Sequence, residues 1–167
     1  GNGMTCIDCH KTENHEMLGK LYSLSSSDEG RLMCTECHEG AVHQNNTLNR
    51  HSDKVACQTC HIPEYAKGVP TKMVWDWSTT GRVNEDGSFI KEHDSLGNVT
   101  YKSQKGSFKW ATHVTPDYVW FNGTGENTVY GDIIQDTTQI LKINKLNGSY
   151  DDPKAQIIPV KIHRGKQ

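Results

Sequence analysis

The chain repeats one short pattern three times, as CIDCH at residues 6–10, CTECH at residues 34–38 and CQTCH at residues 57–61. The three copies contain every cysteine of the sequence, namely Cys6, Cys9, Cys34, Cys37, Cys57 and Cys60. A histidine follows each second cysteine, at His10, His38 and His61. C-x-x-C-H is the attachment motif of c-type haem. Its two thiols form thioethers with the porphyrin vinyl groups, and its histidine reaches the iron as the proximal ligand. The pattern therefore predicts three covalently attached haems c.

Disulfide bonds and zinc are the alternatives to haem for paired cysteines, and each accounts for less of this pattern. A disulfide scaffold explains the even count but not a histidine after every second cysteine. Zinc would require each Cys-Cys-His set to recruit one more ligand. The composition also favours haem, because only 34% of the residues are hydrophobic and the mean hydropathy is −0.73. Three macrocycles would supply apolar surface that the side chains lack.

Charge and hydropathy exclude several classes of protein. Eighteen basic residues against 20 acidic ones give a formal charge of −2, which leaves no excess of Lys or Arg for nucleic acid phosphates. No apolar run approaches the roughly 18–20 residues that a membrane helix needs. The partners that we expect are redox proteins, or further haem-bearing segments or subunits of the same assembly, such as an oligomer or a filament.

The attachment motifs divide the chain unevenly. All of them lie within residues 6–61, so we expect a three-haem segment at residues 1–66. Residues 67–167 contain all four tryptophans, and we expect a haem-free segment of loops and short strands that packs on the haems. The predicted fold class is a multihaem cytochrome c with little regular secondary structure. It would combine short helices around the haems with a haem-free segment that contains loops and strands.

Local patterns predict the individual elements. Short helices are expected over residues 11–24 and around residues 31–43. A turn capped by Ser52 or Asp53 should lead into the third motif and stop near Pro63. Candidate strands cover three ranges: 117–121, 138–143 and 155–162. Asp-Gly or Asn-Gly pairs predict turns at three places: residues 86–87, 122–123 and 147–148.

Distal iron ligands are the next requirement, because three haems with two histidines each need three further imidazoles. His15, His43 and His51 lie nearest the motifs, and we predict them as the distal metal ligands. His15 follows His10 closely, and the distal face lies across the porphyrin plane, so His15 would serve a neighbouring haem. Surface positions for these residues remain open, as does ligation by other side chains: His113, His163, Met4, Met17, Met33 and Met73.

Both ends of the sequence indicate a trimmed chain. Gly1-Asn2-Gly3 is not an initiator sequence, and the last residues, HRGKQ, carry no evident stop. We therefore expect a mature or trimmed product, or part of a longer protein. Haem is attached to C-x-x-C-H outside the bacterial cytoplasm, which predicts a periplasmic or extracellular location.

Four segments carry a family resemblance that goes beyond the haem motifs. They are HSDKVACQTCHIPEYAKGVPTKMVWDWSTTG (51–81), KGSFKW (105–110), PDYVWFNGT (116–124) and DPKAQIIPVKIHRGKQ (152–167). In sequence and order they resemble the octahaem tetrathionate reductase family of multihaem cytochromes. PTKMVWDWST and RGKQ are the most specific of these matches. Family members hold eight haems in one longer chain, so this chain resembles an internal three-haem portion.

The resemblance implies an exported redox protein whose haems are mostly bis-histidine electron relays. It also implies one active-site haem with a lysine ligand and an open side for tetrathionate, nitrite or hydroxylamine. Lys72 is the lysine that we nominate as catalytic, although an ordinary surface role for it remains open. A ligating lysine must be deprotonated, so its pKa must fall. We expect electron transfer through closely packed haems. Part of a multihaem reductase is the alternative, and whether the chain is an enzyme stays open.

Overall fold

The computed structural model describes residues 3, 5, 12–13, 16–17 and 34–167. These fall into two compact units. The first unit takes the chain up to His61 together with Tyr118–Ile158, and the second takes Ile62–Asp117 and Pro159–Gln167. Residues 118–158 therefore cluster with the segment that carries the attachment motifs. The expected division at residue 66 into haem-bearing and haem-free segments stays a prediction.

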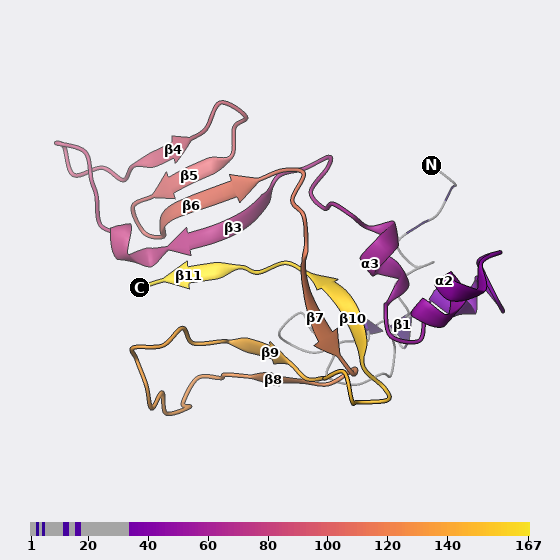
Figure 1. The fold of residues 1–167 in the computed structure, drawn as a ribbon. Helices are drawn as coiled ribbons and strands as arrows, with labels where there is room; N and C mark the ends of the chain where they lie inside the picture. Colours follow the sequence, from indigo (N-terminus) through magenta and orange to yellow (C-terminus); the bar gives the residue numbers. More distant parts are fainter. Residues whose placement is uncertain (1–2, 4, 6–11, 14–15, 18–33) are drawn as a thin grey trace. The chain divides into compact units, whose positions relative to one another are not determined.

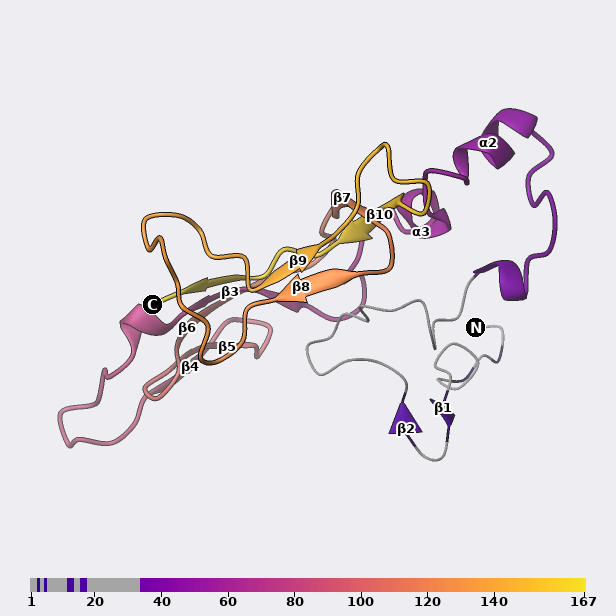
Figure 2. The same ribbon diagram turned by 90° about the horizontal axis from the view of Figure 1, so that it is seen from below.

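Short elements joined by long loops make up the described chain (Figures 1 and 2). In chain order they are β1 (Thr12–Glu13), β2 (Glu16–Met17), η1 (Cys34–Glu36), α2 (Asn46–His51), α3 (Cys57–His61), β3 (Thr71–Asp76), η2 (Trp77–Thr79), β4 (Lys91–His93), β5 (Val99–Lys102), β6 (Gly106–Ala111), β7 (Asp117–Phe121), β8 (Gly125–Asn127), β9 (Asn144–Leu146), β10 (Gln156–Val160) and β11 (Arg164–Lys166). The few short helices, the loops and the strands agree with the predicted fold class. No helix in this part of the chain is long and apolar enough to cross a membrane.

Two short helices precede and carry the third attachment motif. The α2 helix, which the sequence did not predict, begins after Asn45, whose side chain accepts a hydrogen bond from the Thr47 N–H at 2.8 Å. Ser52 is the C-cap of this helix, and residues 52–54 form a turn that leads toward the third motif, as expected. The α3 helix ends at His61, two residues before Pro63, as expected for a residue that cannot continue a helix.

The predicted helix over residues 11–24 is wrong where the structure describes it. Strands β1 and β2 pair antiparallel there, with Thr12 opposite Met17 and Glu13 opposite Glu16. The helical spacing of apolar residues extended over little more than one turn, and an isolated helix that short is marginal in water. The rest of this range, and the start of the helix expected around residues 31–43, lie outside the described residues.

Besides β1 and β2, two further small strand pairs belong mainly to the first unit. Strand β7 pairs with β10, which confirms the strand expected at 117–121 and most of the one expected at 155–162. Strand β8 pairs antiparallel with β9. The strand expected at 138–143 is wrong, because those residues belong to the loop that joins β8 to β9 and pairing begins only at Asn144. Apolar residues there satisfied the strand pattern without a partner strand.

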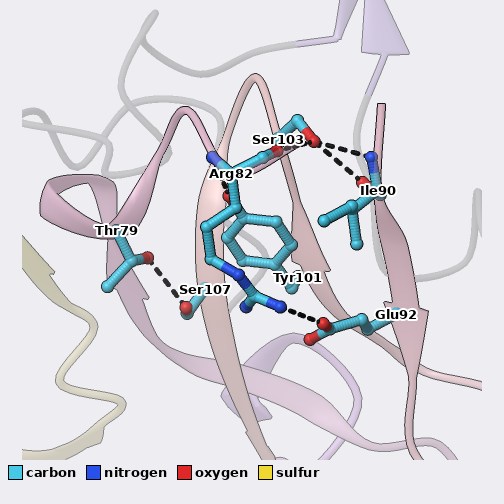
Figure 3. Close-up of polar contacts among 7 residues, drawn as sticks. All are labelled: Thr79, Arg82, Ile90, Glu92, Tyr101, Ser103 and Ser107. Carbon is cyan, nitrogen blue, oxygen red and sulfur yellow. Dashed lines mark hydrogen bonds and ion pairs between the residues drawn. The ribbon is translucent and has the colours of Figure 1, made fainter. Parts of the chain in front are cut away.

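A five-stranded sheet forms the second unit, in the order β11-β3-β6-β5-β4. Strand β11 runs parallel to β3, and the other neighbours are antiparallel. Tyr101 is the largest fully buried side chain in the described chain, and its hydroxyl accepts a hydrogen bond from the Arg82 N–H at 3.0 Å. The Arg82 guanidinium lies 4.3 Å from the centre of the Tyr101 ring and pairs with Glu92 (Figure 3).

Buried Ser103 completes this small core. Its hydroxyl donates to the Arg82 carbonyl at 2.5 Å and accepts from the Ile90 N–H at 2.7 Å (Figure 3). The loop before β4 is thereby joined to the end of β5. The Arg82 carbonyl and the Ile90 N–H thus find hydrogen-bond partners within the sheet unit.

Gly106 should be the least replaceable glycine of the sheet. Its φ is +76°, and a Cβ there would lie 2.1 Å from the Asp76 carbonyl oxygen. Gly97 is a matched control, because its φ is +82° but no atom of the described residues lies within 4 Å of an added Cβ. We expect Gly97→Ala to lower the free energy of unfolding by about 1–2 kcal/mol, the left-handed penalty alone. Gly106→Ala should lower it by about 3 kcal/mol or more, because overpacking is added. Denaturant unfolding of the haem-loaded protein, followed by far-ultraviolet circular dichroism, measures both, and equal losses would contradict the steric explanation.

Candidate haem centre

The third attachment motif coincides with helix α3, which contains all five residues of CQTCH. Side chains three and four positions apart share one helix face. Cys57, Cys60 and His61 therefore lie on one side of a single turn. Two thioethers and a proximal imidazole must all reach the same porphyrin, so this is the arrangement that haem attachment needs.

Hydrogen bonds to a distant strand hold this helix in place. The Thr59 hydroxyl, inside the motif, donates to the Ile157 carbonyl at 2.7 Å. The same carbonyl accepts the Ala56 N–H at 3.0 Å, and the Ile157 N–H donates to the Lys54 carbonyl at 2.8 Å. Ala56 is buried beneath these bonds. The start of β10 thus fixes the turn that carries Cys57 and His61.

The second motif lies beside the third. Its first residues form η1, in which the His38 N–H donates to the Cys34 carbonyl at 2.9 Å. The pKa of the Cys34 thiol is raised, first because the thiol is partly desolvated and then because the Cys57 thiol is close enough to hydrogen-bond with it. The four described cysteines are all free thiols: Cys34, Cys37, Cys57 and Cys60. The remaining predicted site residues, Cys6, Cys9, His10 and His15, lie outside the described residues.

Among the predicted distal ligands, His43 has the most defined surroundings. Its backbone N–H donates to Asn49 Oδ1 at 3.0 Å, and Asn49 Nδ2 donates back to the His43 carbonyl at 2.8 Å. Asn49 lies on α2, so the helix fixes the backbone that carries the imidazole. Sequence reasoning missed Asn49. The one signal in the sequence was that Asn49 lies six positions after His43, and many residues lie that close to a histidine without binding its backbone.

The imidazoles of His43 and His61 face one another across a gap. Their ring centres are 6.1 Å apart and their planes differ by 20°. Trp75 and Trp77, at 4.1 Å and 16°, show how close two rings come when their faces touch. His43 and His61 are therefore neighbours whose ring faces are not in contact. A ring nitrogen binds a metal through a lone pair in the plane of the ring, so an iron between them would require each ring to turn a nitrogen toward it.

A buried polar atom supports iron ligation by His43. Nδ1 of His43 is buried and has no hydrogen-bond partner within the described part of the chain. Such a nitrogen is destabilising unless a group outside the polypeptide satisfies it. Imidazole is the commonest metal ligand in proteins, and either ring nitrogen can serve. The donor set around His43 and His61 therefore fits a haem iron.

The apolar core also fits a chain that holds a large prosthetic group. The buried hydrophobic residues of the described chain are Ala56, Tyr101, Phe108, Phe121 and Ala155. Only three of these belong to the first unit, and two of those are alanines. Val42 and Leu48, which flank His43 and Asn49 in the sequence, are exposed. Porphyrin would provide the apolar contacts that these side chains lack.

The other histidines are placed with less definition. His51 lies exposed in the last turn of α2, and its carbonyl accepts the Val55 N–H at 2.8 Å. In the second unit, His113 Nδ1 lies 3.2 Å from a Glu64 carboxylate oxygen. The pKa of His163 is lowered, first by burial and then by the nearby ammonium groups of Lys161 and Lys72.

His43 is the predicted distal ligand that the structure brings close to a proximal histidine, His61. No group of three His, Cys, Asp or Glu side chains gathers at a metal-binding distance within the described ranges.

Lys72, the nominated catalytic residue, lies on β3 in a cage of aromatic rings. Its Nζ is 3.8 Å from the centre of Phe108, 4.8 Å from Trp75 and 5.3 Å from Trp110. The aromatic faces favour the charged ammonium. This residue belongs to the second unit, whereas the described attachment motifs belong to the first.

The pKa of Lys72 is lowered, despite its aromatic neighbours. Burial is the largest cause, followed by the charges of Lys105 and Lys102. A lysine with a lowered pKa gives up its proton more readily, as iron ligation would require. The surroundings of Lys72 therefore favour the neutral amine more than those of an ordinary surface lysine do.

Comparison with known proteins adds independent findings. A family model described as bacterial cytochrome c matches residues 72–167, a range without any attachment motif. The crystal structure of octahaem cytochrome c from Shewanella oneidensis is similar, with a TM-score of 0.83 and 41% sequence identity. The match covers 99% of this chain and 36% of that one, so this chain spans about a third of the relative's length. No curated protein matches. The predicted resemblance to a portion of an octahaem cytochrome, and the multihaem fold class, are confirmed.

Removal of His43 should open one iron. We expect His43→Ala to convert a single haem from low-spin to high-spin, because the imidazole opposite His61 is lost. Asn49→Ala should produce a smaller high-spin fraction, since the imidazole remains but its backbone is released. His93→Ala, an exposed residue of β4, is the matched control. Electron paramagnetic resonance and visible spectra of the purified proteins measure the spin states, and an unchanged His43→Ala spectrum would remove this residue from the iron.

Proposed function

The chain belongs to the bacterial cytochrome c family, and from this premise we propose that it transfers electrons through three closely packed haems c. The haems would be attached at Cys6 and Cys9, at Cys34 and Cys37, and at Cys57 and Cys60. Bound haem supplies an iron that is alternately reduced and oxidised. The polypeptide would hold the porphyrin through thioethers to its cysteines, would supply imidazoles to the iron and would set the polarity around it.

The pairing of His43 with His61 is the observation that carries this proposal. An iron with imidazoles on both sides has no coordination position free for a substrate. Such a centre exchanges electrons without binding the reactant, and its potential is tuned by ligands and burial. His43 lies close to His61, with ring centres 6.1 Å apart, and its buried Nδ1 has no partner among the described residues, which makes it available to an iron at the third motif.

The contact of Cys34 with Cys57 supports a short path between haems. These cysteines belong to different motifs, and the Cys57 thiol contributes to the raised pKa of Cys34. Haems tethered at neighbouring thiols would lie near one another, which suits electron exchange.

We place the protein in the periplasm or outside the cell, because haem is attached to this motif outside the bacterial cytoplasm. Because the octahaem relative is longer, we also propose that redox proteins or further haem-bearing segments receive the electrons.

The number of haems is the first test of this proposal. Mass spectrometry of the denatured holoprotein should show the polypeptide with three haems still attached, because thioethers survive unfolding. Replacement of Cys57 and Cys60 by alanine should remove one haem mass. A mass equal to the bare polypeptide would contradict haem attachment and revive the zinc alternative.

Part of a multihaem reductase is the second candidate function. The observation in its favour is the lowered pKa of Lys72, a residue that the family resemblance nominates as an iron ligand. In this scheme Lys72 would supply a neutral amine to one iron whose other side takes tetrathionate, nitrite or hydroxylamine. The role of Lys72 would be to hold that ligand position and keep it free of a second imidazole.

Reoxidation kinetics separate the two functions. A conduit with imidazoles on every iron should be reoxidised slowly by nitrite, hydroxylamine or tetrathionate, and should show a wholly low-spin spectrum. A reductase should be reoxidised rapidly, and Lys72→Ala should abolish that reaction. Lys109→Ala, an exposed lysine on neighbouring strand β6, is the control. Rapid reoxidation that survives Lys72→Ala would remove Lys72 from the site, whereas slow reoxidation with all three oxidants leaves the conduit.

A further inference from the structure

Thr59 occupies a position of the third motif that haem attachment leaves free. C-x-x-C-H fixes the two cysteines and the histidine, but neither of the two residues between the cysteines. In CQTCH these are Gln58, which is exposed, and Thr59, which is half-buried. The Thr59 hydroxyl donates to the Ile157 carbonyl of β10 at 2.7 Å, and Figure 2 shows α3 beside this strand. Thr59 therefore has a defined partner that the attachment chemistry does not require.

Helix geometry places the haem-binding side chains away from this contact. Successive residues of an α-helix are turned by about 100° around its axis. Cys57 and His61 are thus each turned by roughly 160° from Thr59, and Cys60 by about 100°. Cys60 and His61 are exposed, whereas Thr59 is half-buried. One side of the short helix contacts β10, and the opposite side carries the groups that bind haem.

Two hydrogen bonds to one carbonyl fix the rotation of α3. The Ile157 carbonyl also accepts the Ala56 N–H at 3.0 Å, and it can accept both bonds because a carbonyl oxygen has two lone pairs. The Ala56 bond lies just before the helix, and alone it would act as a hinge. The Thr59 bond joins the same carbonyl to a residue inside the helix, which stops α3 from turning about that hinge. The Thr59 hydroxyl thus decides where the opposite side of the helix points.

The direction of the His61 imidazole follows from that rotation. His61 is the last residue of α3 and lies two positions after Thr59. The orientation of an axial ligand and the contacts that fix it are means by which a polypeptide tunes a haem iron. A change in the rotation of α3 should therefore be detectable at the iron.

We propose that Thr59 is a positioning residue for the haem at the third motif. Its hydroxyl, bound to the Ile157 carbonyl, sets the rotation of α3 and through it the plane of the axial imidazole of His61. Thr59 acts through His61 and not by contact with the iron. This role depends on the proposed function, because it requires haem attached at Cys57 and Cys60.

Four residues at position 59 separate the hydroxyl from packing. Valine has nearly the shape of threonine without the hydroxyl, serine keeps the hydroxyl without the methyl group, and alanine lacks both. We expect Thr59→Ser to share the spectrum of the wild-type protein, and Thr59→Val and Thr59→Ala to share an altered one. Thr138→Val is the matched control, because it removes a hydroxyl that donates to Asp136 Oδ1 at 2.6 Å in the loop between β8 and β9.

Electron paramagnetic resonance of the ferric holoprotein is the measurement, because the g values of a low-spin haem respond to the orientation of its axial imidazoles. The variant in which alanine replaces Cys57 and Cys60 identifies the signal of the third haem by its loss. In Thr59→Val that signal should shift or broaden, while the other haem signals stay in place. Redox titration should likewise move the midpoint potential of a single haem. The far-ultraviolet circular dichroism should match that of the wild-type protein, which a general folding defect would not leave unchanged.

The outcomes distinguish this role from the proposed function. A polypeptide mass without haem at Cys57 and Cys60 would contradict the proposed function itself. Three attached haems with an unchanged Thr59→Val spectrum would overturn the positioning role alone. A spectrum that Thr59→Ser shares with Thr59→Ala would assign the effect to the methyl group, which also overturns the role, as would an equal change in Thr138→Val. If Thr59→Val fails to hold the third haem, the comparison of Thr59→Ser with Thr59→Ala decides the question in the same way.

Discussion

The hydrogen bonds of the Ile157 carbonyl hold the helix that contains the third attachment motif. It accepts hydrogen bonds from the Ala56 N–H and the Thr59 hydroxyl, one immediately before the third attachment motif and one inside it. The orientation of Cys57 and His61 depends on these two bonds. On the other side of this region, Asn49 holds the backbone of His43 at both polar groups. These four hydrogen bonds fix the two segments that carry His43 and His61, whose ring centres lie 6.1 Å apart.

The two units stabilise themselves by different means. The second unit closes its own sheet around Tyr101 and Phe108 and satisfies its loop polar groups through Arg82 and Ser103. The first unit buries little beyond Phe121 and two alanines among its described residues. Among the described residues each unit buries few apolar side chains, and the described attachment motifs lie in the first unit. Haem bound there would add apolar packing to that unit, so loss of haem should disturb the first unit before the sheet.

Sequence patterns predicted the family better than they predicted the backbone. The C-x-x-C-H repeats indicated a multihaem cytochrome because haem attachment fixes both residue type and spacing, and the comparisons confirm that family. Strand β7 was predictable from its run of aromatic and branched residues. Residues 138–143 have equally apolar character, yet no strand of the described chain lies opposite them, and pairing depends on distant residues that a local pattern does not contain. Helix α2 was missed because its stabilisation comes from the Asn45 cap and from contacts of Asn49, not from an apolar face.

The bond between Thr59 and Ile157 spans 98 positions of the chain. Closing a loop of that length costs conformational entropy before the contact contributes any stability. The hydrogen bonds of helix α3 are local, so this helix can form before β10 docks against it. During folding, the third motif should therefore acquire its helical turn early and its fixed position late.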